Sequence, residues 1–268
     1  MTKIFLCMSV IPSRVLEARF WHNLDLLKQQ IIPFETLFIS IPKMYKRFPN
    51  LSIDLEKFNN YDWITIIPLE IDYGPASKYM GPLLHQWDRI KDNILIVIDD
   101  DREYHSKMGL LYQDFFSKYE NIHVASGNRE LYFNTFFYQR MDPNFLDIRE
   151  ARCKYVSGFM SFALHCRNDW TPLIDYTCTI LEKFPDSFFH DEAILLNYFR
   201  CFGIGVYYIN FKMIEFVKEE MIDALCESTL DKRTRVEQEC LDWTMTHYKI
   251  KTKPWIQNSK LRRKYLLG

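Results

Sequence analysis

The sequence predicts an α/β protein whose central sheet is mainly parallel and is covered by helices on both sides. Short apolar runs alternate with longer amphipathic segments, which is typical of strands joined by crossover helices. The run Ile94 to Ile98 is apolar throughout, as expected for a strand buried on both faces. With 268 residues, of which 48% are hydrophobic, the chain is long enough for one full core.

The elements follow in order along the chain. The expected strands are 3–10, 36–41, 61–68, 94–98, 122–126 and 206–209, and Gly158 interrupts a further apolar run over 154–164. The expected helices are 14–30 with Ser13 as its N-cap, 77–91, 108–119, 169–182 and 191–200. The last forty or so residues are expected to be helical and basic.

Composition narrows the class of protein. The net charge of −1 excludes an overall basic field that would recruit nucleic acid. The seven cysteines are odd in number and form no C-x-x-C, which favours a reducing, cytoplasmic location over a disulfide framework. The apolar stretch 4–10 is too short to span a membrane, so a soluble protein is expected. The basic stretch 249–264 is either a solvated helix or a weak contact with a membrane surface.

Three consecutive carboxylates, Asp99, Asp100 and Asp101, follow the apolar run at 94–98. An acidic turn after a strand would need no function. In open α/β sheets, however, ligands bind at the carboxyl ends of strands, and adjacent carboxylates repel one another unless a cation relieves them. Two oxygen ligands spaced D-x-D suit Mn²⁺ or Mg²⁺. We therefore expect Asp101 to bind the metal, Asp99 to bind the metal or a ribose hydroxyl, and Asp100 to contact the sugar or a metal-bound water.

Three further segments contain candidate binding or catalytic residues. In Asp72-Tyr73-Gly74-Pro75-Ala76-Ser77-Lys78, a turn is followed by a helix start, where free N–H groups and Lys78 could hold a diphosphate. Ser157 and Gly158 lie in an apolar run, where glycine marks a simple bulge or a close ligand approach. His190, Asp191 and Glu192 open a helix. They either cap it or bring a carboxylate to an acceptor hydroxyl, with Asp191 as a general base. Among the other histidines, His247 is a candidate for a third metal ligand.

Taken in order, these motifs resemble those of GT-A glycosyltransferases. The chain is most similar to the small nucleotide-sugar transferases of bacteria and large DNA viruses, which carry G-P-[AS]-[ST]-K before D-D-D. The resemblance covers about residues 3–210. It implies one GT-A domain over 1–210, with a nucleotide-binding half of about 1–105 and an acceptor half of about 106–210. A helical extension over 211–268 is expected to pack on the same domain.

The resemblance implies a metal-dependent transfer of a hexose from a nucleoside diphosphate sugar, UDP by default and otherwise GDP, to a hydroxyl of a glycan or another acceptor. Mn²⁺ or Mg²⁺ would lie on Asp99 and Asp101, and Asp191, Glu192 and His190 would face the acceptor. The donor would be bound by Pro12, Ser13, Arg14, Asp72, Tyr73, Gly74, Lys78, Asp99, Asp100, Ser157 and Gly158. Neither the sugar nor the stereochemistry is determined by the sequence.

Three other functions are considered. A nucleotidyltransferase would use a metal ion on the same carboxylates, but with a nucleoside triphosphate. The turn Val10-Ile11-Pro12-Ser13-Arg14, however, lacks the glycines common in those enzymes. A metal-dependent nuclease or phosphatase would need more carboxylates at other strand ends, where only Asp72 is an obvious candidate. A carbohydrate-binding or scaffold protein could use the many aromatic residues, although these serve equally well as core.

Overall fold

The computed structural model describes residues 2–128, 156, 161–212 and 230–250. In this part of the chain, seven strands form one sheet in the order β3-β2-β1-β4-β6-β5-β7. The strands are β1 (Ile4–Ser9), β2 (Thr36–Pro42), β3 (Ile64–Leu69), β4 (Ile94–Val97), β5 (Val124–Asn128), β6 (Phe162–His165) and β7 (Val206–Lys212). All neighbours pair in parallel except β6, which runs antiparallel to β4 and to β5. The prediction of a mainly parallel sheet is confirmed.

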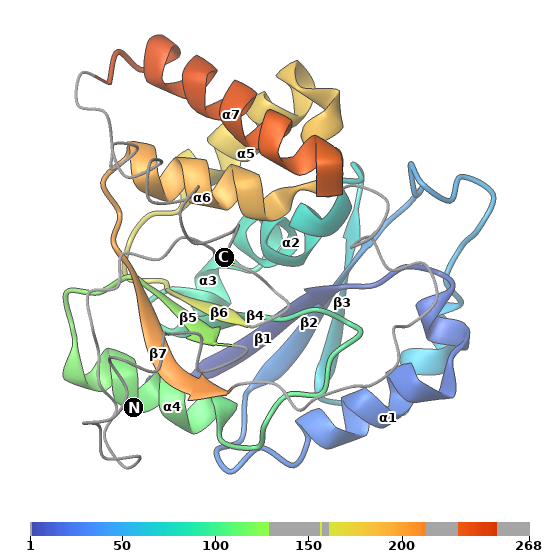
Figure 1. Ribbon diagram of the computed structural model, residues 1–268. Helices are drawn as coiled ribbons and strands as arrows, with labels where there is room; N and C mark the ends of the chain where they lie inside the picture. The colour runs from blue at the N-terminus through green and yellow to red at the C-terminus, as the bar shows by residue number, and fades with distance from the viewer. Residues whose placement is uncertain (1, 129–155, 157–160, 213–229, 251–268) are drawn as a thin grey trace, which may run out of the picture.

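Helices cover both faces of this sheet (Figure 1). One face carries α1 (Ala18–Leu27) and α4 (Met108–Lys118). The other carries α2 (Ser77–His85), α3 (Trp87–Ile90), α5 (Thr171–Lys183), α6 (Asp191–Cys201) and α7 (Leu230–His247). Short 3-10 helices are η1 (Arg14–Leu16), η2 (Leu55–Phe58), η3 (Gly74–Ala76) and η5 (Pro185–Phe189).

The alternation of side chains along β1 shows why the chain forms these layers. Phe5 and Cys7 belong to the apolar cluster under α2, α5 and α6, whereas Leu6 and Met8 belong to the cluster over α1 and α4. All four residues of β4 are completely buried, because this strand lies in the middle of a sheet covered on both sides.

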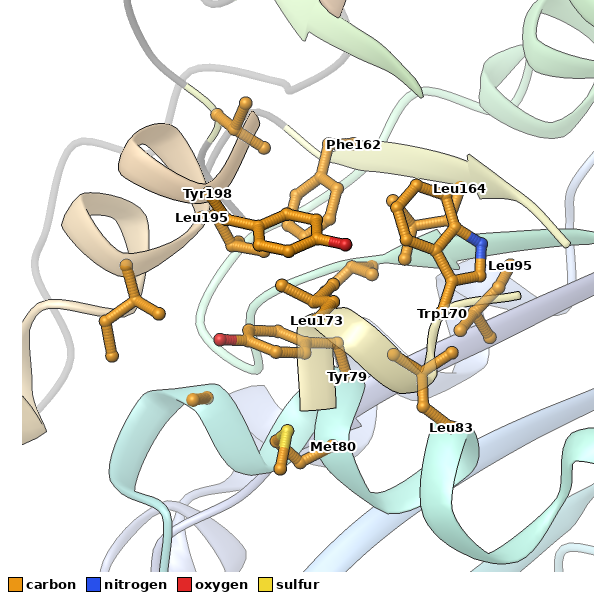
Figure 2. Close-up of a cluster of buried hydrophobic side chains, with 14 of the residues drawn as sticks. Tyr79, Met80, Leu83, Leu95, Phe162, Leu164, Trp170, Leu173, Leu195 and Tyr198 are labelled. Atoms are coloured by element: carbon orange, nitrogen blue, oxygen red, sulfur yellow. The ribbon is translucent and has the colours of Figure 1, made fainter. Parts of the chain in front are cut away.

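A close-packed cluster joins α2, α5 and α6 to the sheet (Figure 2). Tyr79 from α2, Leu173 from α5 and Tyr198 from α6 lie in one cluster with Phe162 of β6. The exposed fraction of each of these side chains is 4% or less. Helices α2 and α6 are therefore held in place through this shared cluster, because core packing of this kind leaves little freedom for rigid shifts.

Three predicted elements differ from the structure. The helix expected over 14–30 is wrong in its first turn: η1 ends at Leu16, and Glu17 is extended (φ −89°, ψ 130°) before α1 begins. Ser13 makes no side-chain cap, because this turn folds to bring Arg14 inward. β3 begins at Ile64, later than predicted. The helix expected over 77–91 is broken at Gln86.

Some expectations fall on parts of the chain that the structure does not describe. Ser157, Gly158 and most of the basic stretch lie outside the described residues, as does the segment 213–229 that precedes α7. Helix α7 packs on α6, where the side-chain amide of Asn197 donates to the carbonyl oxygen of Glu237 at 3.0 Å. Within the described chain, we find no helix that combines the length and apolarity needed to cross a membrane.

Candidate functional site

The acidic triplet lies at the carboxyl ends of two adjacent parallel strands. Strand β1 leads into the turn at Arg14, and β4 leads into Asp99, Asp100 and Asp101. The backbone N–H of Ile98 still donates to the carbonyl of Cys7 at 3.0 Å, so the segments that continue β1 and β4 separate only beyond this point. The sheet therefore brings the first turn and the triplet together at the edge where ligands of α/β proteins bind.

Lys78 joins the triplet to the start of α6. Its ammonium nitrogen Nζ lies 2.7 Å from Asp99 Oδ1 and 2.9 Å from Asp191 Oδ2. Lys78 is 3% exposed and Asp191 is 5% exposed. Burial alone would lower the pKa of Lys78, but the carboxylates of Asp191 and Asp99 outweigh it and raise that pKa above its ordinary value. Lys78 is therefore a permanently charged link between two carboxylates.

Gly74 allows this link to form. Its φ of +62° lies in the left-handed region, and a Cβ at this position would collide with the carbonyl oxygen of Phe188. The segment before Lys78 can therefore lie directly against the segment before Asp191. No residue larger than glycine allows the same approach without a shift of backbone.

Asp72 holds the turn that precedes Lys78. Its Oδ1 accepts from the backbone N–H of Gly74 at 2.8 Å, and its Oδ2 accepts from that of Lys46 at 2.7 Å. The expected cradle of free N–H groups is not present in the form predicted: η3 precedes α2, and the N–H of Ser77 is already bonded to the carbonyls of Gly74 and Pro75. The reason is that a 3-10 turn continues directly into the helix, so the helix has no open start here.

Burial and mutual repulsion disfavour the charged forms of Asp100 and Asp101 in the triplet. Loss of hydration and the nearby charge of Asp101 raise the pKa of Asp100 to about 8, although Arg14 opposes this shift. The pKa of Asp101 is raised as well, by loss of hydration and by Asp99, and is lowered in part by Arg102 and Arg14. These carboxylates are thus held at a density of negative charge that favours either protonation or a bound cation.

One tyrosine and two arginines contact the triplet, and a second tyrosine contacts the first turn. The hydroxyl of the buried Tyr104 accepts from the backbone N–H of Asp99 at 2.8 Å. Arg14 Nη2 lies 3.4 Å from Asp101 Oδ2, and Arg102 Nε lies 3.3 Å from Asp101 Oδ1. Tyr45 donates from its hydroxyl to the carbonyl of Val10 at 2.8 Å.

The structure brings only part of the predicted set together. Lys78, Asp99, Asp191, Asp101 and Arg14 form one connected group of charges. The neighbours Pro12, Ser13, Tyr73, His190 and Glu192 flank this group along the chain. His247 is instead stacked on Trp243, with ring centroids 4.5 Å apart, among aromatic residues of α7. Sequence reasoning missed Tyr45, Arg102 and Glu17, the last of which lies 3.8 Å from Arg14, because none of them belongs to a motif.

The site offers few side chains that could bind a metal ion. Among the described residues, no group of three or more His, Cys, Asp or Glu side chains is placed to hold a metal ion. The side chains of Asp99 and Asp101 are 28% and 16% exposed, so both can still be reached from solvent. This geometry suits a hard cation that takes one or two carboxylates and fills its other positions with water or phosphate oxygens.

Comparison with known proteins supports the fold. No family model matches the sequence, and no curated protein matches it. A mannosyltransferase from Pyrobaculum calidifontis, solved with GDP-Man and Mn²⁺, aligns with a TM-score of 0.54 and 11% identity over 98% of this chain and 68% of its own. Glucosyl-3-phosphoglycerate synthase from Mycobacterium tuberculosis aligns with a TM-score of 0.50 and 11% identity over 94% and 82%. The chain therefore shares its α/β fold with GT-A-type glycosyltransferases.

Proposed function

We propose that this protein is a divalent-metal-dependent glycosyltransferase that moves a hexose from a nucleoside diphosphate sugar to a hydroxyl of an acceptor. The observation that carries the proposal is the position of Lys78, a buried cation between a carboxylate of the acidic triplet and the carboxylate that opens α6. One side of this link would face the donor diphosphate, and the other would face the acceptor. The fold shared with two glycosyltransferases is in accord with it.

Asp99 and Asp101 would hold Mn²⁺ or Mg²⁺. The raised pKa of Asp101 and of its neighbour Asp100 supports this assignment, because a cation at the triplet would relieve the repulsion that raises both. When bound, the ion would supply charge neutralisation to the departing diphosphate. The nucleotide-binding half then corresponds to about residues 1–105 and the acceptor half to about 106–210, with 211–268 as an extension.

Lys78 would stabilise the leaving group. As the bond between the anomeric carbon and the diphosphate oxygen breaks, negative charge grows on the diphosphate. A buried ammonium group needs no reorganisation to meet that charge, and such preorganised groups contribute about 3 to 4 kcal/mol to transition-state stabilisation in other enzymes. Because Lys78 keeps its proton, it acts through its charge and not as an acid.

Asp191 would face the acceptor hydroxyl. In an inverting reaction its carboxylate removes the proton of that hydroxyl as the oxygen attacks the anomeric carbon. In a retaining reaction the leaving phosphate takes that proton, and Asp191 only orients the acceptor. His190 and Glu192, which flank it, would contact the acceptor or a phosphate.

Calorimetric titration tests the proposal. UDP and GDP are titrated, each with and without Mn²⁺, into wild-type protein, Asp101→Ala and the control Asp114→Ala, which removes an exposed carboxylate from α4. We expect Mn²⁺-dependent binding of one nucleotide in the wild type and the control, and its loss in Asp101→Ala. UDP is the first nucleotide to test.

Two outcomes would overturn the proposal. If neither diphosphate binds under any condition but a nucleoside triphosphate does, the nucleotidyltransferase alternative replaces it. If Asp101→Asn retains full transfer activity, the metal assignment is wrong, because loss of a charge-stabilising group costs two or more orders of magnitude in rate.

A further inference from the structure

Arg14 is a buried cation whose contacts are unusually poor. It is 3% exposed, yet its closest anionic neighbours are Asp101 Oδ2 at 3.4 Å from Nη2 and Glu17 Oε1 at 3.8 Å from Nη1. The other buried cation of the site, Lys78, lies 2.7 Å from Asp99. A charge-assisted bond is normally 2.7 to 2.9 Å long, so Arg14 is held near Asp101 without a tight bond to it.

The unused donors of Arg14 point to a missing acceptor. A guanidinium group carries five N–H donors. Among the residues that the structure describes, Nε and Nη1 of Arg14 are buried without a hydrogen-bond partner. The buried hydroxyl of Ser13, beside Arg14 in the turn, also lacks a partner among these residues. Buried polar atoms without partners are uncommon in folded proteins and require an explanation. An anion with several oxygens, such as a diphosphate, would supply the acceptors that this turn lacks.

The carboxylate of Asp101 cannot bind both Arg14 and a divalent ion equally well. Its carboxylate already lies between the guanidinium groups of Arg14 and Arg102. A divalent cation on this carboxylate would repel the Arg14 charge at short range, in surroundings where screening is weak. The Arg14 contact at 3.4 Å, like the Arg102 contact at 3.3 Å, is longer than a normal charge-assisted bond and is therefore easily broken.

We propose that Arg14 is the counter-ion of Asp101 in the metal-free protein, and that it turns to the donor diphosphate when the divalent ion takes Asp101. This inference rests on the proposed function, whose metal site and donor it adopts. Arg14 then has opposite effects on two equilibria: it weakens binding of the metal alone and strengthens binding of the nucleotide with the metal. By linkage, metal and nucleotide favour each other, so they bind together and neither binds tightly alone.

Calorimetry on the full chain separates the two effects. Mn²⁺ is titrated alone, and UDP and GDP are titrated at saturating Mn²⁺, into wild type, Arg14→Gln and Arg235→Gln. Arg235 is 57% exposed and paired with Asp186, so its substitution removes an equal charge at a distant surface. We expect Arg14→Gln to bind Mn²⁺ alone about three- to tenfold more tightly and the nucleotide about tenfold or more weakly. Arg235→Gln should change neither affinity by more than about twofold.

Unchanged nucleotide affinity in Arg14→Gln would overturn the inference, as would weaker binding of Mn²⁺ alone. If circular dichroism shows that Arg14→Gln does not fold, Arg14→Lys decides instead. Arg14→Lys keeps the charge but loses the planar guanidinium group that can bind two oxygens at once. This variant should bind the nucleotide about fivefold or more weakly. Wild-type affinity in Arg14→Lys would equally refute the inference. A wild-type protein that binds no nucleotide with Mn²⁺ refutes the proposed function itself, whereas a refutation confined to Arg14 leaves that function standing.

Discussion

Removal of the Lys78 charge should destabilise the protein strongly and in a pH-dependent manner. Lys78→Met keeps most of the volume of the side chain but leaves Asp191 and Asp99 facing each other without their shared cation. Loss of one partner from a buried ion pair costs about 3 to 5 kcal/mol. Because the Asp99 side chain is 28% exposed and can rehydrate, we expect about 2 to 4 kcal/mol here.

The pH dependence follows from the signs of the pKa shifts. The pKa of Lys78 is raised in the folded protein, so its stabilising effect is complete below the ordinary pKa of lysine and is lost only above it. Between pH 5 and 8 Lys78 therefore stays charged in the wild type. In Lys78→Met the two unpaired carboxylates take up protons as the pH falls, so the loss of stability should shrink toward pH 5.

Urea unfolding at pH 8 and pH 5 measures the free energy of unfolding for each variant. Lys91→Met is the matched control, because Lys91 is an exposed lysine just before β4, at the end of the strand opposite the triplet. The control should stay within about 0.5 kcal/mol of the wild type at both pH values. A loss below about 1 kcal/mol in Lys78→Met at pH 8, or a loss that grows on acidification, would refute the reasoning.

Three further predictions concern the surroundings of Lys78 and the triplet. Gly74→Ala should cost at least about 1 to 3 kcal/mol by urea unfolding, since the new Cβ meets the Phe188 carbonyl at a positive φ; wild-type stability would contradict the close approach. Tyr104→Phe removes the acceptor of the Asp99 N–H and should cost about 0.5 to 1.5 kcal/mol in the same assay, with a change near zero as the contrary result. Because the pKa of Asp100 is raised to about 8, the metal-free folded state binds more protons than the unfolded state, and its stability should fall by up to about 1.4 kcal/mol per pH unit between pH 6.5 and 8. Melting temperatures in EDTA check this fall, which should be smaller in Asp100→Asn, where only Asp101 keeps a raised pKa; equal slopes in both proteins would count against it.

The fold was predictable because it depends on local patterns. The apolar run before Asp99 predicts a strand buried on both faces, and β4 is completely buried. The segments that interrupt such patterns were not predictable. The apolar periodicity after Ser13 favours one continuous helix, but the burial of Arg14 beside Asp101 ends the first turn at Leu16. That contact joins residues far apart in the sequence, so no local pattern could indicate it.

The candidate site was predictable as a set of residues but not as a network. The motifs place Lys78, Asp99 and Asp191 at strand and helix ends, because each motif is local. That one ammonium group contacts both carboxylates depends on Gly74 and on the apolar cluster around Tyr79, to which α2, α5 and α6 all contribute. Tyr45 and Glu17 could not be found from sequence, since a buried tyrosine and a solvated glutamate are the ordinary interpretation of such residues.

Under the proposed function, the charges of the site favour joint binding of the metal and the diphosphate. Asp99 and Asp191 share one ammonium group, and Asp101 lies between two guanidinium groups, so much of the negative charge is already balanced before any ligand arrives. A divalent cation alone would add positive charge to a site that holds three basic side chains. A diphosphate alone would meet the carboxylates of the triplet. The two ligands together compensate each other, and they satisfy both the triplet and the unpartnered donors of Arg14.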